Sequence, residues 1–279
     1  MASHTNYSDN TRYAGAGRDR DRRQASQHQP KAERLHEVAA RPWPHPAAVT
    51  LLILWVAGVI GLVVLAVAAH ANPAFPFDRQ ISSWVQHLQG QRETSTLNTI
   101  GDLAGPFAAA IEYVIILGAL LLFRLFREAL CVAVSGLGAE VLNIIINGLV
   151  KRPRPPTYHG HVVAGLGAHS FPSGHTADAV GLYGFLIFLA ILAARAYPRW
   201  RPWLTAAIIL CVYFIVDIGV SRVIEGQHWP TDVLAGYLLG ALTLVVGVTL
   251  YHRLAERAVG KAPRGAIWRR PATGIPATS

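Results

Sequence analysis

Cysteine, acidic residues and charge in general are scarce in this sequence. Its 279 residues include two cysteines and one methionine, and only 15% of them are charged. Cys131 and Cys211 both fall inside apolar segments, so we expect small core residues there and neither a disulfide nor a thiolate metal site. The 16 Asp and Glu are outnumbered by 25 Lys and Arg. No basic patch is interleaved with aromatic residues, which argues against nucleic acid as a partner.

Apolar residues, in contrast, make up 52% of the chain and are gathered into blocks. Each block approaches the roughly 20 residues that a helix needs to cross a bilayer, although the second and fifth are short. Buried helices of a soluble protein would usually carry a polar stripe, and these blocks mostly have none. We therefore predict an all-α integral membrane bundle of six transmembrane helices. The six blocks are Ala48–His70, Pro106–Phe123, Ala129–Val150, Thr176–Ala196, Trp203–Val220 and Val233–Tyr251.

The segments outside these blocks predict three regions. Residues 1–42 are polar and basic and should form a disordered cytoplasmic tail. Residues 43–252 form the six-helix membrane domain, in which the first block is an uncleaved anchor rather than a signal peptide. Residues 253–279 form a second basic cytoplasmic tail. In the first outer loop, residues 71–105, apolar residues at helical spacing predict a helix lying on the membrane surface. These residues are Phe77, Ile81, Trp84, Val85 and Leu88.

The placement of the basic residues orients the predicted bundle. Most Lys and Arg fall in the two tails and in the short loops that share their side, as the positive-inside rule requires of a cytoplasmic face. We therefore expect a multi-pass protein of the cell (plasma) membrane with both termini in the cytoplasm. Much of the net charge of +9 is then a topology signal, and it suits contact with anionic lipid headgroups.

A set of polar residues stands at the outer ends of three successive apolar blocks, where the topology argument places them all on one membrane face. Arginine presents a planar fork of donors that matches phosphate oxygens, and the start of a helix presents free N–H groups to the same oxygens. We therefore predict a phosphate-binding site on the extracytoplasmic side. The set comprises Arg154, Ser173, Gly174, His175, Arg222, His228 and Asp232.

Two histidines in this set suit phosphoryl transfer. His228 and Asp232 are four residues apart, so the carboxylate can orient the imidazole and leave its other nitrogen free to attack. His175 can then protonate the departing oxygen. Taken singly, these residues have structural explanations: a helix cap for Ser173 and Asp232, or a snorkelling side chain for Arg222. Their common order and common membrane face favour function.

A metal site is the main chemical alternative, because several histidines are also on the outer side. The pair His159 and His161 lies in a Gly-rich loop without a helical scaffold, and carboxylates are few. We therefore expect no metal and no cofactor. The remaining outer histidines in question are His169, His175 and His228.

The segments Pro172-Ser173-Gly174-His175 and Ser221-Arg222, with His228 and Asp232 following, resemble the second and third signatures of the type 2 phosphatidic acid phosphatase superfamily, the lipid phosphate phosphatases. The resemblance covers about residues 48–251. It implies a phosphohistidine on His228, support from Asp232, acid catalysis by His175 and no metal. The implied phosphate ligands are Arg154, Ser173, Gly174 and Arg222. The implied substrates are membrane lipid phosphates: phosphatidic acid, phosphatidylglycerol phosphate or a polyprenyl pyrophosphate.

One position departs from the family pattern. The first signature has a lysine seven residues before Arg154, and this chain has Asn147 there. We hypothesise that Lys151, one helical turn further on, reaches back to the phosphate in its place. Glu140, Asn143 and Asn147 share one helix stripe and should act as helix-to-helix contacts or tune the histidines, as should Asp178.

The missing lysine keeps a second class of function open, namely a lipid-phosphate binder with weak or no catalysis. Two further enzyme alternatives are a phosphotransferase and a vanadate-dependent haloperoxidase of related architecture, and the apolar blocks argue against the haloperoxidase. The sequence leaves the particular lipid and the oligomeric state open.

Overall fold

The computed structural model describes residues 38–40, 45–89, 106–156 and 169–261. Seven α-helices and one 3₁₀ turn, and no strand, occur in these ranges, so the all-α prediction is confirmed. The predicted tails fall largely outside the described residues. The helices are α3 (His45–Ala71), α4 (Pro76–Gln89), α6 (Pro106–Leu122), α7 (Phe126–Val150), α8 (Gly174–Ala196), α9 (Arg201–Ile224) and α10 (Pro230–Lys261), with the 3₁₀ turn Pro198–Trp200 before α9.

Five of these helices, α3, α7, α8, α9 and α10, are long and apolar enough to cross a membrane. Helix α6 is also apolar but shorter, with an apolar stretch over Ala109–Leu122. The prediction of a helical membrane protein is confirmed at this level, and the count of six spans stays a prediction. Large apolar side chains point outward along the bundle, as a lipid environment allows. Examples are Leu54, Val64, Val114, Leu149 and Trp203.

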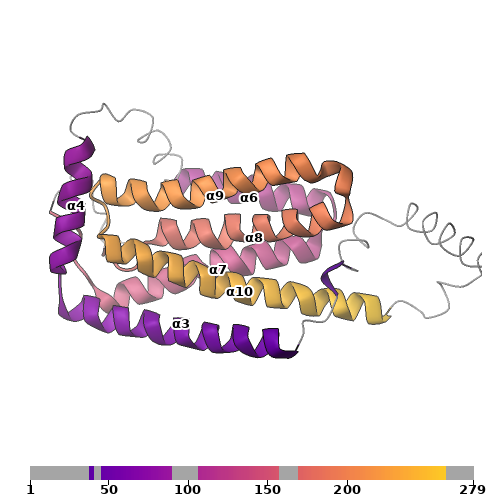
Figure 1. Ribbon diagram of the computed structural model, residues 1–279, viewed down its shortest axis with the longest axis horizontal. Coiled ribbons are helices and arrows are strands. Elements are labelled where there is room, and N and C mark those ends of the chain that lie inside the picture. The colour runs from indigo at the N-terminus through magenta and orange to yellow at the C-terminus, as the bar shows by residue number, and fades with distance from the viewer. Residues whose placement is uncertain (1–37, 41–44, 90–105, 157–168, 262–279) are drawn as a thin grey trace, which may run out of the picture.

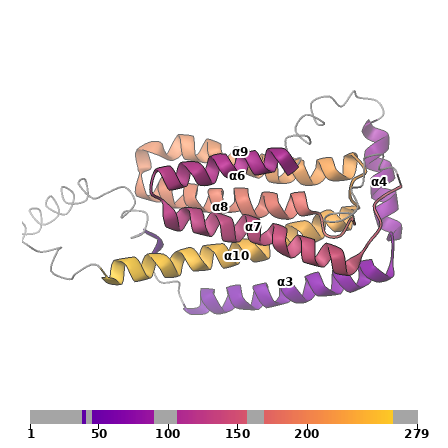
Figure 2. The same ribbon diagram turned by 180° about the vertical axis from the view of Figure 1, so that it is seen from behind.

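Helices α7, α8 and α10 form the centre of the bundle, and each packs extensively on the other two (Figure 1). Helix α9 packs on α8, α3 lies along α10, and α6 lies along α7, as the view from behind also shows (Figure 2). Helix α4 stands across one end of this bundle. At that end α3, α7 and α9 finish and α8 and α10 begin, so their loops meet beside α4.

Glycines allow the backbones of the three central helices to touch. A Cβ atom on Gly181 of α8 would lie 2.5 Å from the main-chain oxygen of Ser135 in α7. One on Gly240 of α10 would lie 2.4 Å from the main-chain oxygen of Ala177 in α8. Small residues at such contacts are the usual means of close helix packing in membranes. These contacts therefore fix the distances between α7, α8 and α10, and with them the positions of the polar residues at the helix ends.

Helices α10 and α4 bear on the sequence-based expectations. Helix α10 continues past residue 252, because Leu254 and Ala255 keep its apolar face packed on the bundle and Ala255 is fully buried. The first outer loop does contain a helix, α4. It is amphipathic, with Phe77 and Trp84 exposed and Asp78 buried. Its position on a membrane surface stays a prediction.

Candidate active site

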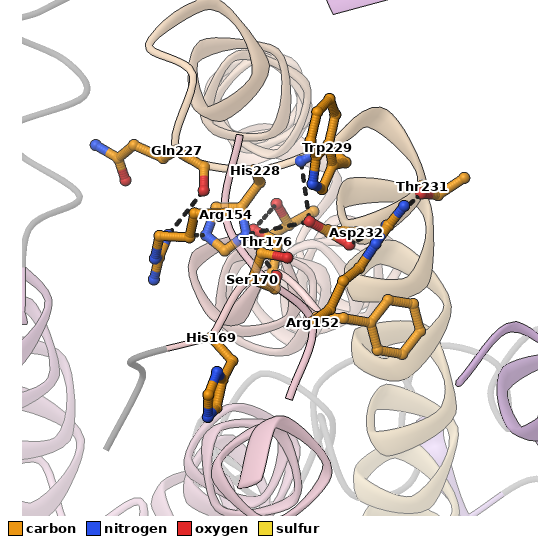
Figure 3. Close-up of polar contacts among 12 residues, drawn as sticks. Arg152, Arg154, His169, Ser170, Thr176, Gln227, His228, Trp229, Thr231 and Asp232 are labelled. Atoms are coloured by element: carbon orange, nitrogen blue, oxygen red, sulfur yellow. Dashed lines mark hydrogen bonds and ion pairs between the residues drawn. The ribbon is translucent and has the colours of Figure 1, made fainter. Parts of the chain in front are cut away.

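Seven predicted site residues lie at the end of the bundle that α4 crosses, although they are far apart in the sequence. Figure 3 shows three of them, Arg154, His228 and Asp232, close together. The loop after α7 supplies Arg154, and the start of α8 supplies the next group. The end of α9 and the start of α10 complete the set. In chain order these residues are Arg154, Ser173, Gly174, His175, Arg222, His228 and Asp232.

His228 is buried and fixed through one ring nitrogen. Its Nδ1 lies 2.7 Å from the main-chain oxygen of Ser170, and only 3% of the residue is exposed. Because a carbonyl oxygen only accepts hydrogen bonds, Nδ1 carries the proton and Nε2 has a free electron pair. Nε2 lies 3.4 Å from Nη1 of Arg154. The imidazole thus presents its nucleophilic nitrogen to a guanidinium.

The surroundings keep this imidazole neutral. Burial lowers the pKa of His228 well below 6.5, and the neighbouring Arg154, then His175 and Arg222, lower it further. The hydrogen bond to the Ser170 carbonyl acts in the opposite direction and is outweighed. A neutral imidazole is the form that can attack phosphorus.

Asp232 stands beside His228, and its hydrogen bonds go elsewhere. Its Oδ2 is 3.9 Å from Nδ1 of His228 and accepts the Trp229 main-chain N–H at 2.9 Å. Its Oδ1 accepts a hydrogen bond from Nη1 of Arg152 at 2.5 Å. Asp232 is therefore close enough to stabilise positive charge on the imidazole, while the Ser170 carbonyl makes the direct hydrogen bond. Orientation of His228 by Asp232 stays a prediction.

Arg154 stands at Nε2 of the imidazole, and Arg222 lies near enough to lower the pKa of His228. Arg154 donates from Nη1 to the main-chain oxygen of Gln227 at 2.8 Å. Arg222 donates from Nη1 to the side chain of Gln227 at 3.0 Å and from Nη2 to Glu225 at 3.3 Å. These contacts hold both guanidinium groups beside the nucleophile. Two cations in a largely buried setting favour an anionic group such as phosphate.

The start of α8 faces the same space. Ser173 is the residue before the helix, its Oγ pairs with Thr176 Oγ1 at 2.9 Å, and its N–H donates to the Asp232 carbonyl at 3.0 Å. The first amides of a helix lack acceptors within the helix and attract anions. A Cβ atom on Gly174 would lie 2.4 Å from Asn143 Nδ2, so any larger residue there requires the Asn143 amide to move. His175, in the first turn, lies near enough to influence His228 electrostatically.

Asn147 does not point at the two arginines. Its Nδ2 donates to the main-chain oxygens of His169 at 2.8 Å and Phe171 at 3.3 Å, and its Oδ1 accepts the His169 N–H at 3.3 Å. These bonds flank Ser170, whose carbonyl holds His228. Lys151 is exposed at the left-handed end of α7, with φ of 54°. Its contact with phosphate stays a prediction.

Sequence reasoning missed three residues of this end of the bundle: Asp78, Arg152 and Ser170. Arg152 is 1% exposed and bonds both Asp78 and Asp232, at 2.7 and 2.5 Å. The repeat Arg152-Pro153-Arg154-Pro155 could have indicated Arg152, because it contains two arginines and only Arg154 had been given a role. Asp78 is 74 residues away from Arg152 and gave no local signal. Ser170 acts through its main chain, which a side-chain pattern does not reveal.

Two further predictions concern the polar residue Asp178 and the absence of a metal site. Asp178 of α8 accepts a hydrogen bond from the Tyr113 hydroxyl of α6, as expected of a contact between helices. Among the described residues, no group of three or more His, Cys, Asp or Glu side chains is arranged to hold a metal ion. His159 and His161 lie outside those residues, so the metal prediction stays untested.

Fold and site together define a helical membrane protein that carries a phosphoryl-transfer centre at one end of its bundle. The sequence matches the model of the PAP2 superfamily over residues 128–256, which includes every predicted site residue. Over this region the chain matches the PAP2 superfamily, whose signatures its sequence resembles.

Individual relatives agree with this assignment. Phosphatidylglycerophosphatase B of Bacillus subtilis strain 168 is 27% identical over 184 residues, which cover 64% of this chain and 85% of that protein. Undecaprenyl-diphosphatase BcrC of the same organism is 29% identical over 155 residues, covering 53% and 70%. The crystal structure of a transmembrane PAP2-type phosphatidylglycerolphosphate phosphatase from Bacillus subtilis matches with a TM-score of 0.55 and 25% identity. That match covers 76% of this chain and 98% of the other.

Proposed function

We propose that this protein removes phosphate from a membrane lipid phosphate or pyrophosphate through a phosphohistidine formed on His228. The observation that carries the proposal is the state of that imidazole: buried, bonded through Nδ1 to the Ser170 carbonyl, and with Nε2 3.4 Å from Arg154. A neutral nucleophile beside a fixed cation, at the end of a membrane bundle, suits attack on an anionic lipid headgroup.

In the first step, Nε2 of His228 attacks phosphorus in line with the leaving oxygen. An N–P bond forms, the P–O bond breaks, and His175 gives its proton to the departing lipid oxygen. Arg154, Arg222 and the first amides of α8, at Gly174 and His175, hold the non-bridging oxygens and balance the charge that develops on them.

In the second step, water attacks phosphorus and the N–P bond breaks. His175, now neutral, takes the proton from that water, so inorganic phosphate leaves and both histidines return to their starting state. The phosphorylated imidazole carries a positive charge because Nδ1 keeps its proton. Asp232 Oδ2, 3.9 Å from Nδ1, stabilises that charge.

The substrate class follows from the relatives and from the setting of the site. The two Bacillus relatives are named for phosphatidylglycerophosphate and undecaprenyl diphosphate, a phosphomonoester and a pyrophosphate of lipids. The outward apolar side chains of the bundle let a lipid tail remain in the bilayer while its headgroup enters the site. We therefore propose a lipid substrate of one of these two kinds.

The orientation in the membrane is also a proposal. Helix α3 begins and α10 ends at the end of the bundle opposite the site (Figure 1). Arginines gather at the helix ends there, on the turn between α6 and α7, the turn between α8 and α9, and the end of α10. By the positive-inside rule this end faces the cytoplasm, and the site faces the other side of the plasma membrane. These arginines are Arg124, Arg127, Arg195, Arg199, Arg201 and Arg253.

The deciding experiment measures phosphate release by the purified full-length protein in detergent. The panel contains phosphatidic acid, phosphatidylglycerol phosphate and undecaprenyl pyrophosphate, each with and without EDTA, beside His228→Ala. We expect release that EDTA leaves intact and that the variant abolishes. Trapping of acid-labile, base-stable phosphate on the wild type would identify the phosphohistidine.

Asn147 favours one other function, a lipid-phosphate binder without turnover, because its amide serves the loop rather than the phosphate. That alternative predicts lipid-phosphate binding by a folded protein, with no phosphate released from any member of the panel. Release from any one lipid would exclude it.

A further inference from the structure

A buried ion network joins α4 to the start of α10. Nη2 of Arg152 donates to Asp78 Oδ2 at 2.7 Å, and Nη1 donates to Asp232 Oδ1 at 2.5 Å. The three side chains have no exposed surface. A buried charge is tolerated only with its partners in place, and removal of one partner leaves another uncompensated. The network therefore fixes α4 and α10 relative to the segment that carries Arg152.

Asp78 also contacts α10 directly. Its Oδ1 accepts the main-chain N–H of Thr231 at 3.0 Å, and its Oδ2 accepts the Thr231 hydroxyl at 2.7 Å. Thr231 lies in the first turn of α10, where main-chain N–H groups have no acceptor within the helix. A carboxylate from another helix thus caps α10, and its negative charge suits that end of the helix dipole.

The main chain of Arg152 bonds Ser170, the residue whose carbonyl holds His228. Its carbonyl accepts the Ser170 N–H at 2.8 Å, and the Ser170 carbonyl is the partner of His228 Nδ1 at 2.7 Å. On the other side, Asp232 accepts the N–H of Trp229, the residue after His228, at 2.9 Å. Arg152 therefore bonds Ser170, whose carbonyl holds the imidazole, and Asp232, which holds the main chain of the next residue, Trp229.

We propose that Asp78 is a positioning residue for His228, acting through Arg152, which makes α4 a part of the active site. This inference rests on the proposed function, because it takes His228 to be the nucleophile. Elsewhere on its surface α4 exposes Phe77 and Trp84. The helix thus connects an apolar outer surface with the residue that attacks the phosphate.

The first test is Asp78→Asn. The new amide nitrogen places a donor where Oδ2 now accepts hydrogen bonds from Arg152 and Thr231, so the network must rearrange. Because Arg154 and Arg222 are untouched, we expect kcat to fall about 10- to 100-fold with KM little changed. Ser82→Ala is the matched control: Ser82 is also buried on α4, and its Oγ has no hydrogen-bond partner among the described residues. It should leave kcat unchanged.

A double-mutant cycle tests whether Asp78 acts through Arg152. In an Arg152→Gln background the network is already broken, so Asp78→Asn should cost little more. The same fold-loss from Asp78→Asn in both backgrounds would overturn the proposed route.

A spectroscopic readout separates this inference from the proposed function. In protein labelled with ¹⁵N-histidine, the resonances of His228 are identified by their loss in His228→Gln. We expect one tautomer, protonated at Nδ1, in the wild type and in Ser82→Ala, and a shifted or mixed signal in Asp78→Asn. Absence of phosphate release by the wild type would defeat the proposed function alone, whereas unchanged His228 resonances in Asp78→Asn would overturn the inference.

If Asp78→Asn does not fold, Thr231→Val decides the question. It removes the hydroxyl that bonds Asp78 Oδ2 and Arg152 Nη1, both at 2.7 Å, and keeps both charges. We expect a smaller shift of the His228 resonances in the same direction, and identical spectra would overturn the inference.

Discussion

Replacement of Asn147 tests the most unusual position of this chain. The lysine that the family signature has there would add positive charge, and a simple charge argument therefore predicts faster turnover in Asn147→Lys. The structure predicts the opposite. The Asn147 amide donates to the His169 and Phe171 carbonyls and accepts the His169 N–H. Lysine has no acceptor for that N–H, which lies at the start of the segment that holds His228.

The magnitude follows from these three hydrogen bonds. One is short, at 2.8 Å, and two are longer, at 3.3 Å. Their combined net contribution is about 1–3 kcal/mol. Its loss would lower the population of the conformation in which residues 169–171 hold His228 about 5- to 150-fold. Ser170 keeps its own bonds to the Arg152 and Pro153 carbonyls, at 2.8 and 3.0 Å, so part of the order survives. We expect kcat to fall toward the lower part of that range.

The assay is phosphate release from the best lipid of the panel by wild type, Asn147→Leu and Asn147→Lys, with thermal melts as the folding control. Leucine has a similar size and no hydrogen-bonding group, so it isolates the loss of the three bonds. Turnover by Asn147→Lys above the wild-type rate would refute the reasoning, and wild-type turnover by Asn147→Leu would show that these bonds do not matter.

Three other predictions follow from the site and the core. Burial, then Arg154 and His175, lowers the pKa of His228 below 6.5, so below that pH the unfolded chain binds more protons than the folded one. The free energy of unfolding should fall as the pH decreases below 6.5, and thermal melts should show a smaller fall in His228→Gln; equal falls would contradict the neutral imidazole. Arg154→Gln should lower kcat/KM about 10- to 150-fold and Arg154→Lys less, because lysine keeps the charge without the fork; equal losses would argue against bidentate binding. Gly181→Val should lower the melting midpoint by about 2–12 °C because its Cβ would meet the backbone of α7, whereas Gly118→Ala, with open space around its Cβ, should not; equal midpoints would contradict the close packing.

The bundle and the family were predictable because they depend on local patterns. Runs of apolar residues give spanning helices regardless of partners, and the segment from Pro172 to His175 falls where a loop turns into α8. The helical pattern after Pro76 likewise predicted α4. The end of α10 was placed too early, because charged residues after Tyr251 obscured the apolar face that continues through Ala255.

The partners of the catalytic residues were less predictable because main-chain atoms and distant residues supply them. Spacing alone suggested Asp232 as the hydrogen-bond partner of His228, and the Ser170 carbonyl holds that place. A carbonyl has no sequence signature. The link from Asp78 to Arg152 crosses 74 residues and joins α4 to the loop after α7, and no local pattern specifies how these two pack.

The backbone contacts among α7, α8 and α10 have a consequence for engineering. Where Gly181 and Gly240 bring main chains together, an added Cβ would meet a backbone oxygen, so these contacts among the central helices offer little room for adapting the enzyme to new lipids. Helix α3 is different, since only 6% of its most apolar stretch is buried against the rest of the protein. Chimeras that exchange the outward faces of α3 and α6 with those of relatives should therefore alter the choice of lipid tail while leaving the chemistry at His228 intact.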